Sequence, residues 1–407
     1  MQEARRTIEE VARSSYGRLL AYLSSRTRDV AGAEDALGDA LLSALNTWPR
    51  DGVPKSPEAW LLTSARNRLV DHARHARVRE EHAEALELLL KGSGGTGSAD
   101  EWPDERLKLF FVCAHPAIDH ALHTPLMLQT VLGLDAARIA QAFLVQPPAM
   151  GQRLSRAKKK IREAGIPFEI PLERDWPARL TAVLEAVYAA YGLGWDEAVG
   201  ADPRGRDLVN EAVWLARVLR QRMPKEPEAR GLFALMLFCD ARQNARRTPG
   251  GAYVPLSEQD PASWSIATIG EAESELASAA GMGRIGRFQL EAAIQSVHCD
   301  RARSGRTDWS AIVTFYEQLV RLAPTLGVRV GQAAAVAETL GAEAGLSMLD
   351  TLEGHAVVAY QPYWAVRAHL LQRLGRLAPA ARAFDRAIGL TEDEAVRKFL
   401  LARRDQP

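Results

Sequence analysis

The stretch from residue 126 to 164 constrains the fold more than any other part of the chain, because several helix signals follow one another closely in it. An apolar segment, Leu126–Leu132, ends at Gly133. Asp135 then stands where its side chain can cap a short second helix, and Pro147-Pro148 allow a third helix to begin, since proline costs little in a first helical turn. The pattern predicts three helices joined by short turns. The second, from Asp135 to Phe143, is expected to bury Ile139, Ala140 and Phe143.

The third helix of this stretch is amphipathic and cationic. Its apolar residues recur every three or four positions from Met150 to Ile161, which leaves glutamine and basic side chains for its other faces. Glutamine and arginine are the side chains that pair with adenine and guanine in the major groove. Two helices joined by a short turn, the second of them cationic, therefore predict DNA binding, while a basic face that meets only solvent is the alternative. The predicted DNA contacts are Gln152, Arg153, Arg156, Lys158 and Lys159.

Three more amphipathic helices are expected near the N-terminus, over residues 7–28, 29–48 and 57–81. Trp48-Pro49 is expected to end the second of them. The third begins apolar, with Trp60 in its first turn, and becomes strongly basic after Ala65. An aromatic residue followed by a cationic helix can stack on an unpaired base and hold phosphates, although a basic surface helix without a ligand fits as well.

A glycine- and serine-rich segment, Lys91–Ala99, predicts a flexible tether between the two basic parts of the chain. A tether of about 25 residues extends to about 80 Å at most. Two DNA elements one or two helical turns apart lie within that reach, so both basic parts can touch one duplex.

Residues 1–165 resemble a bacterial sigma factor of the extracytoplasmic-function type in three stretches. AEDALGDALLSALNTWP (33–49) is similar to the helix that grips the polymerase clamp, and PEAWLLTSARNRLVDHARHARVR (57–79) to the helix that melts and reads the −10 element. ARIAQAFLV…GQRLSRAKKKIR (137–162) resembles the helix-turn-helix that reads the −35 element. The resemblance implies polymerase contacts at Glu34, Asp35, Asp39 and Leu42, and −10 contacts at Trp60, Arg66, Asn67, Asp71, Arg74 and Arg77.

Three positions depart from the pattern of that family. Gly38 stands where glutamine is usual, and Arg138 stands where an acidic residue is usual. Gly151 lies inside the recognition helix, at a cost of about 1 kcal/mol relative to alanine. These departures bear on the promoter contacts and on the strength of polymerase binding, and leave the expected architecture unchanged.

The remainder of the chain reads as helical pairs. The segment Tyr363–Leu390 places large and small residues at the offsets of a tetratricopeptide repeat, and weaker copies precede it. Three to five irregular helical pairs are therefore expected between Asp175 and Arg404, forming a solenoid with a concave surface for a peptide or a neighbouring domain. A helical bundle without a groove is the alternative.

The whole chain resembles the subgroup of these sigma factors that carries a C-terminal tetratricopeptide-like extension. The likeness rests on DARQNARRTPGGAYVPLSEQDPASW (240–264), RFQLEAAIQSVH (287–298) and KKKIREAGIPFEIP (158–171). It implies that the extension regulates activity in place of a separate anti-sigma protein, and we expect it to do so by contacting the sigma domains within the same chain.

Composition limits the other possibilities. Lysine plus arginine equals aspartate plus glutamate at 51 each, so a nucleic-acid surface must be local. Cys113, Cys239 and Cys299 are scattered and form no CxxC pair, which argues against a disulfide framework and a metal site. No phosphate loop, nucleophile elbow or other catalytic constellation is present, so we expect no enzyme activity and no cofactor. No apolar run approaches the length of a membrane span, and we expect a cytoplasmic protein without a membrane partner.

Together these features predict an all-α protein with four parts: a sigma region 2 (1–82), a linker (83–102), a sigma region 4 helix-turn-helix (103–166) and a tetratricopeptide-like regulatory domain (172–407). The predicted function is to direct core RNA polymerase to specific promoters. Its expected partners are core RNA polymerase, promoter DNA and an unidentified protein or small-molecule signal. The alternatives are a ligand-responsive helix-turn-helix repressor and a tetratricopeptide-type scaffold for protein interactions.

Overall fold

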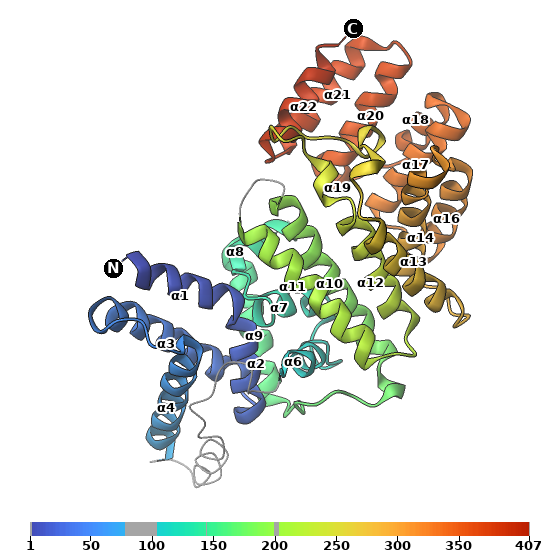
Figure 1. The fold of residues 1–407 in the computed structure, drawn as a ribbon. Helices are drawn as coiled ribbons and strands as arrows, with labels where there is room; N and C mark the ends of the chain where they lie inside the picture. Colours follow the sequence, from blue (N-terminus) through green and yellow to red (C-terminus); the bar gives the residue numbers. More distant parts are fainter. Residues whose placement is uncertain (1, 78–103, 144, 199–202, 407) are drawn as a thin grey trace. The chain divides into compact units, whose positions relative to one another are not determined.

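The computed structural model describes residues 2–77, 104–143, 145–198 and 203–406. Helices make up the regular structure of these ranges, apart from one isolated antiparallel bridge between Arg247 and Tyr253. The predicted all-α class is therefore confirmed. The chain divides into two compact units, Met1–Ala190 and Tyr191–Pro407 (Figure 1). The predicted tether, Lys91–Ala99, lies outside the described residues.

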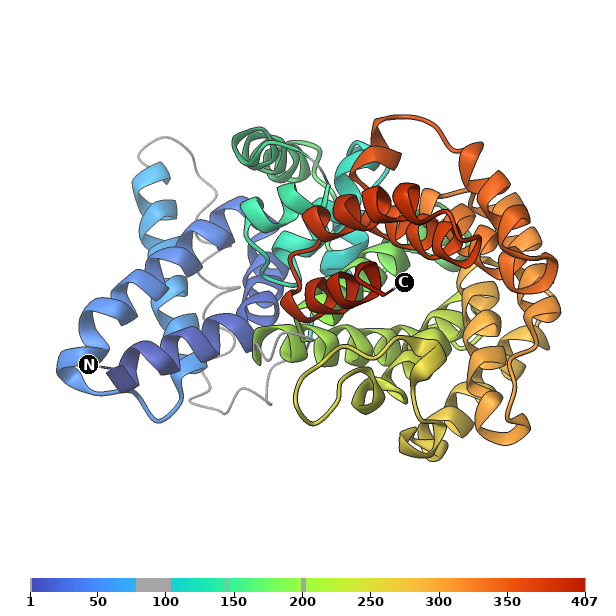
Figure 2. The same cartoon turned by 90° about the horizontal axis from the view of Figure 1, so that it is seen from above.

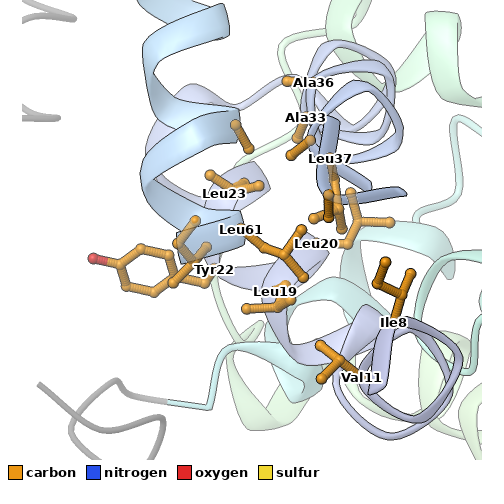
Figure 3. Close-up of a cluster of buried hydrophobic side chains, with 14 of the residues drawn as sticks. Ile8, Val11, Leu19, Leu20, Tyr22, Leu23, Ala33, Ala36, Leu37 and Leu61 are labelled. Atoms are coloured by element: carbon orange, nitrogen blue, oxygen red, sulfur yellow. The ribbon is translucent and has the colours of Figure 1, made fainter. Parts of the chain in front are cut away.

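The first unit begins with four helices that share one apolar core: α1 (Gln2–Ser14), α2 (Tyr16–Thr27), α3 (Val30–Asp51) and α4 (Pro57–Arg77). Figure 3 shows Leu20 and Leu23 of α2 meeting Leu37 of α3 and Leu61 of α4, and all four side chains are fully buried. The Asp29 carboxylate caps α3 by accepting the Gly32 N–H at 3.1 Å. This cap fixes where α3 begins, and α3 is the helix with the predicted polymerase contacts.

Two predictions about these helices are wrong. The expected single helix over residues 7–28 is broken at Ser15, whose hydroxyl donates to the Glu58 carboxylate of α4 at 2.6 Å. That contact crosses to another helix, so the periodicity of the segment could not reveal it. Pro49 does not end α3: it lies inside the helix, which continues to Asp51. The Gly52 N–H then closes it on the Trp48 carbonyl at 3.0 Å.

Within the described residues from 104 onward, the first unit continues with α6 (Arg106–Cys113), α7 (His120–Thr130), α8 (Ala136–Ala142) and α9 (Pro147–Glu163). The predicted cap is confirmed, because the Asp135 carboxylate accepts the Arg138 N–H at 2.8 Å. Gly133 makes the turn before it with a φ of +67°, a conformation that glycine adopts without strain. The predicted burial of Phe143 is wrong: Phe143 is the residue just past α8, where the chain leaves the helix, and its side chain is exposed.

A short 3₁₀ turn, η2 (Glu173–Asp175), leads to α10 (Pro177–Ala198), in which the chain passes from the first unit to the second. The remaining helices belong to the second unit. They are α11 (Pro203–Arg222), α12 (Pro227–Asp240), η3 (Gln243–Arg246), η4 (Leu256–Glu258), η5 (Pro261–Ser263), α13 (Ile266–Ala280), α14 (Arg287–Cys299), α15 (Arg301–Ser304), α16 (Trp309–Leu322), α17 (Leu326–Leu340), α18 (Ala342–Asp350), α19 (His355–Ala359), α20 (Gln361–Arg373), α21 (Leu377–Leu390) and α22 (Glu394–Arg404).

The second unit curves so that its last helix meets an early loop. Figure 2 shows its helices, from green-yellow through orange to red, following a curve that turns back toward α22. The Arg247 guanidinium donates to the Asp393 carboxylate at 2.7 Å, and the rings of Tyr253 and Phe399 meet edge to face at 5.3 Å. The loop between α12 and η4 therefore holds the end of the helical stack.

The segment predicted as a tetratricopeptide repeat forms the helical hairpin of α20 and α21. Ala368 and Leu371 of α20 and Phe384 and Ala387 of α21 lie in one buried cluster. Leu377, which the repeat pattern also selected, is exposed at the start of α21. The helical pairs agree with a solenoid, and the assignment to the tetratricopeptide class stays a prediction.

A buried carboxylate ties three helices of the second unit together. Glu275 of α13 is 6% exposed and pairs with Arg230 of α12 at 2.6 Å and with Arg220 of α11. Burial alone would raise the pKa of Glu275, but the hydrogen bonds from Arg220 and Arg230 outweigh it and lower that pKa. The carboxylate thus stays charged between its two cations.

No helix within the described ranges is long and apolar enough to cross a membrane.

Candidate functional site

The first candidate surface is the exposed face of α3. The helix buries a row of small residues and Leu37 against the core, and it leaves Asp35, Leu42 and Leu45 on the opposite side. Leu42 is 59% exposed and Leu45 is 43% exposed. Two leucines three residues apart share one helix face, so α3 offers an apolar strip beside a carboxylate. Leu45 was not predicted, although its spacing from Leu42 would have identified it.

The other two predicted polymerase contacts are held by partners within the first unit. Asp39 accepts a hydrogen bond from the Arg68 guanidinium of α4 at 2.9 Å, and Arg68 also donates to the Ser43 hydroxyl at 2.7 Å. Glu34 accepts the Tyr16 hydroxyl proton at 3.3 Å and pairs with the Lys158 ammonium of α9. The structure therefore brings Asp35 and Leu42 to the surface and engages Asp39 and Glu34 internally.

The Tyr16 hydroxyl acts as a hydrogen-bond donor to Glu34. Its burial raises its pKa, and the nearby Glu34 carboxylate raises it further. The phenol stays protonated at neutral pH and donates to Glu34. Glu34 therefore has two partners, one neutral and one cationic.

The second candidate surface lies on α4, in the predicted −10 helix. Asn67 and Asp71 are exposed, and Arg66 is half-buried. Trp60 is half-buried as well: its ring meets that of Trp48 edge to face at 5.4 Å and packs against the core cluster. Arg74 and Arg77 lie in the last part of α4, for which the structure describes the helix and not the side chains. Base stacking by Trp60 stays a prediction.

The third candidate surface is the solvent face of α9. Gln152, Arg153, Arg156 and Lys159 are exposed, and their spacing places them on one side of the helix. Met150, Leu154, Ala157 and Ile161 are buried on the other side, as the periodicity predicts. The helix therefore presents a row of hydrogen-bond donors and cations that can reach base edges and phosphates.

Lys158 differs from the other predicted DNA contacts, because it is buried. It stands four residues after Leu154 and three before Ile161, which places it on the buried side of α9. That spacing is visible in the sequence and could have separated Lys158 from the exposed residues. In this arrangement its ammonium is occupied by Glu34 and is not available to a phosphate.

The three cysteines are free thiols, and Cys113 and Cys299 are buried. Burial raises the pKa of Cys113 to about 12 and that of Cys299 to about 11, and it raises the pKa of Cys239 as well. All three thiols are therefore protonated at neutral pH, whereas the thiolate is the form that binds metals. In the ranges that the structure describes, histidine, cysteine and carboxylate side chains form no cluster suited to a metal ion.

Comparison with known proteins supports part of this arrangement. Residues 11–79 match the family model of sigma-70 region 2, which takes in the end of α1 and all of α2, α3 and α4. Residues 179–280 match a family of unknown function (DUF6596). An uncharacterized protein of Rhizobium meliloti (strain 1021) is 38% identical over 396 residues, which cover 96% of this chain and 92% of the relative.

Two mycobacterial proteins match a shorter segment. They are a probable RNA polymerase sigma-C factor of Mycobacterium bovis (strain ATCC BAA-935 / AF2122/97) and the ECF RNA polymerase sigma factor SigC of Mycobacterium tuberculosis (strain CDC 1551 / Oshkosh). Each is 40% identical over 62 residues, which cover 15% of this chain and 31% of the relative. No solved structure matches the chain.

Proposed function

The chain belongs to the same protein family as the Rhizobium meliloti relative and carries a sigma-70 region 2 domain, and from this premise we propose that it is a sigma factor that directs core RNA polymerase to specific promoters. The observation that carries the proposal is the region 2 match over residues 11–79, because it covers the whole of α3 and α4. The short likeness to two mycobacterial sigma factors points the same way. In this role the chain supplies binding and positioning, and the polymerase supplies the chemistry.

Core polymerase binds the exposed face of α3 in this proposal. Leu42 and Leu45 give the interface an apolar centre, and Asp35 supplies a charge at its edge. Protein interfaces usually carry few charges at their centre, where apolar burial supplies affinity. Charges at the rim set the orientation of the partner. The partner surface must therefore offer an apolar patch next to a basic group.

Promoter DNA binds two surfaces of the first unit. We propose that α9 enters the major groove of the −35 element, where Gln152, Arg153 and Arg156 read base edges and Lys159 holds a phosphate. We propose further that α4 contacts the −10 element through Asn67 and Asp71 and through the basic residues that follow them. The exposure of these side chains supports both assignments.

The second unit regulates the first in this proposal. The chain then belongs to the extracytoplasmic-function subgroup with a tetratricopeptide-like extension, acts in the cytoplasm, and receives a protein or small-molecule signal through its helical pairs. The series of helical pairs from α11 to α22 supports the extension. A contact between this extension and the sigma domains remains part of the proposal.

The proposal is tested by equilibrium binding of the full chain to purified core RNA polymerase. Asp35 is exposed on α3, so Asp35→Lys should leave the fold unchanged while placing a positive charge where the partner is basic. We expect tight binding by the natural chain and a large loss in the variant. A chain that does not bind core polymerase, but binds duplex DNA as a dimer, would instead be a repressor; one that shows no salt-sensitive DNA affinity would be a scaffold.

A further inference from the structure

A set of ion pairs joins α3 to α9 inside the first unit. The Lys158 ammonium of α9 pairs with the Glu34 carboxylate of α3, and its side chain is only 8% exposed. One helical turn further on, the Arg162 guanidinium donates to the Asp29 carboxylate at 3.0 Å. These residues are 124 and 133 positions apart in the sequence. The two helices pack against each other along this row of charges.

The backbones of α2 and α7, helices that pack against α3 and α9 respectively, approach each other closely. Gly17 of α2 faces the end of α7, where a Cβ atom on Gly17 would lie 1.7 Å from the Val131 carbonyl oxygen. A Cβ atom on Gly133 would lie 3.3 Å from the Tyr16 ring. Hence only glycine at position 17 permits this approach of α2 and α7.

The contact joins the two surfaces to which the proposed function assigns different partners. Glu34 lies on the helix that faces core polymerase, and Lys158 lies on the helix that faces DNA. Glu34 and Lys158 form an ion pair with each other. A basic group of the polymerase can bind Glu34, or a DNA phosphate can bind Lys158, only after this pair is broken.

We propose that the Glu34–Lys158 pair couples the two binding events: core polymerase takes Glu34 and thereby releases Lys158 for a DNA phosphate. This inference rests on the proposed function. By thermodynamic linkage the effect is reciprocal, so DNA at Lys158 also favours polymerase at Glu34. The coupling changes the affinity for DNA and does not abolish binding in the closed form, because Gln152, Arg153 and Arg156 stay exposed while the ion pair is formed.

The pair can be followed by the reactivity of Lys158 toward an amine-acylating reagent, used at a single-hit dose and read by mass spectrometry. Lys159 is 63% exposed on the same helix and serves as the internal reference. In the free chain we expect Lys158 to react severalfold more slowly than Lys159. Addition of core polymerase, without DNA, should raise the reactivity of Lys158 relative to Lys159.

We expect one variant to loosen the contact without changing either charged residue, because it displaces α7, which packs against α9. Gly17→Ala places a methyl group against the Val131 carbonyl, while alanine is well suited to the helix itself. It should make Lys158 reactive in the free chain and steepen the dependence of log K for a non-specific DNA duplex on log[salt] by about 0.9, the value of one added phosphate contact. Gly270→Ala is the matched control, because Gly270 also lies in a helix and a Cβ atom there meets nothing within 4 Å.

Each outcome decides one step. Equal reactivity of Lys158 and Lys159 in the free natural chain would overturn the closed contact. Polymerase that binds, as measured separately, while Lys158 stays protected would overturn the coupling alone. Failure of polymerase to bind would overturn the proposed function and the coupling with it, whereas the response of Lys158 to Gly17→Ala would still report the closed contact.

Discussion

Replacing Leu42 and Leu45 together by alanine tests the polymerase surface most quantitatively. The two side chains are 59% and 43% exposed, so an interface that covers both removes about one leucine side chain's worth of apolar surface from water. Full burial of one leucine contributes about 1.5–3 kcal/mol, which corresponds to a loss of affinity of about 10- to 150-fold. Because alanine keeps part of this surface, we expect the loss to fall in the lower half of that range.

The assay is the equilibrium dissociation constant of the full chain for purified core RNA polymerase. The double variant should fold normally, because neither leucine is buried and alanine is favourable in a helix. Leu340→Ala is the matched control, since Leu340 is 75% exposed on α17 in the second unit. If the double variant folds and its dissociation constant stays within about twofold of the natural chain, a difference below about 0.4 kcal/mol, α3 is not the polymerase surface.

Three further predictions concern stability and DNA binding. Glu275→Ala should lower the free energy of unfolding by about 3–5 kcal/mol in chemical denaturation, because it leaves two cations without their buried carboxylate. Since the folded pKa of Glu275 is lowered, its stabilising effect is present above the unfolded value of about 4.3 and is lost as the pH falls through the lower folded value, which acid titration of Glu275→Gln against the natural chain will show. Gly286→Ala should cost about 1–3 kcal/mol, because its Cβ atom would lie 2.2 Å from the Glu228 carboxyl carbon and displace the carboxylate that caps α14. Arg156→Ala should weaken duplex DNA binding and lower the slope of log K against log[salt] by about 0.9, in titrations at several salt concentrations.

Matched controls separate these effects from general damage. Glu273→Ala removes an exposed pair with Arg303 and should cost less than about 1 kcal/mol. Gly270→Ala should stabilise α13 slightly, since nothing opposes the added methyl group. Arg174→Ala removes an exposed cation outside α9 and should leave the salt slope unchanged. A control that changes as much as its partner variant would contradict the mechanism given for that variant.

Local signals located several helix ends in the sequence. Asp135 caps α8 and Pro147 opens α9, because the cap and the proline act on backbone groups within a few residues. The break at Ser15 depends on a contact with Glu58 on another helix, so a signal of local periodicity could not reveal it. The ion pair between Arg247 and Asp393 was not predicted for the same reason, because its two residues are far apart in the sequence.

The candidate site, too, could be predicted from the sequence only in part. Helical spacing identified the exposed row of α9, and the family resemblance pointed to Leu42, which is exposed on α3. Spacing also places Lys158 on the buried side of α9. The partner of Lys158 could not be derived from spacing, because Glu34 precedes it by 124 residues. The family resemblance marked Glu34 as a polymerase contact and the cationic pattern of its helix marked Lys158 as a DNA contact, whereas the fold joins the two to each other.

Transcription with purified core RNA polymerase tests the central claim most directly. The full chain and core polymerase are incubated with DNA of the source genome, and the 5′ ends of the transcripts are mapped with and without the chain. The proposed function predicts a set of defined 5′ ends that depends on the chain and is reduced by the Leu42 and Leu45 double variant. Identical 5′ ends with and without a correctly folded chain would contradict it.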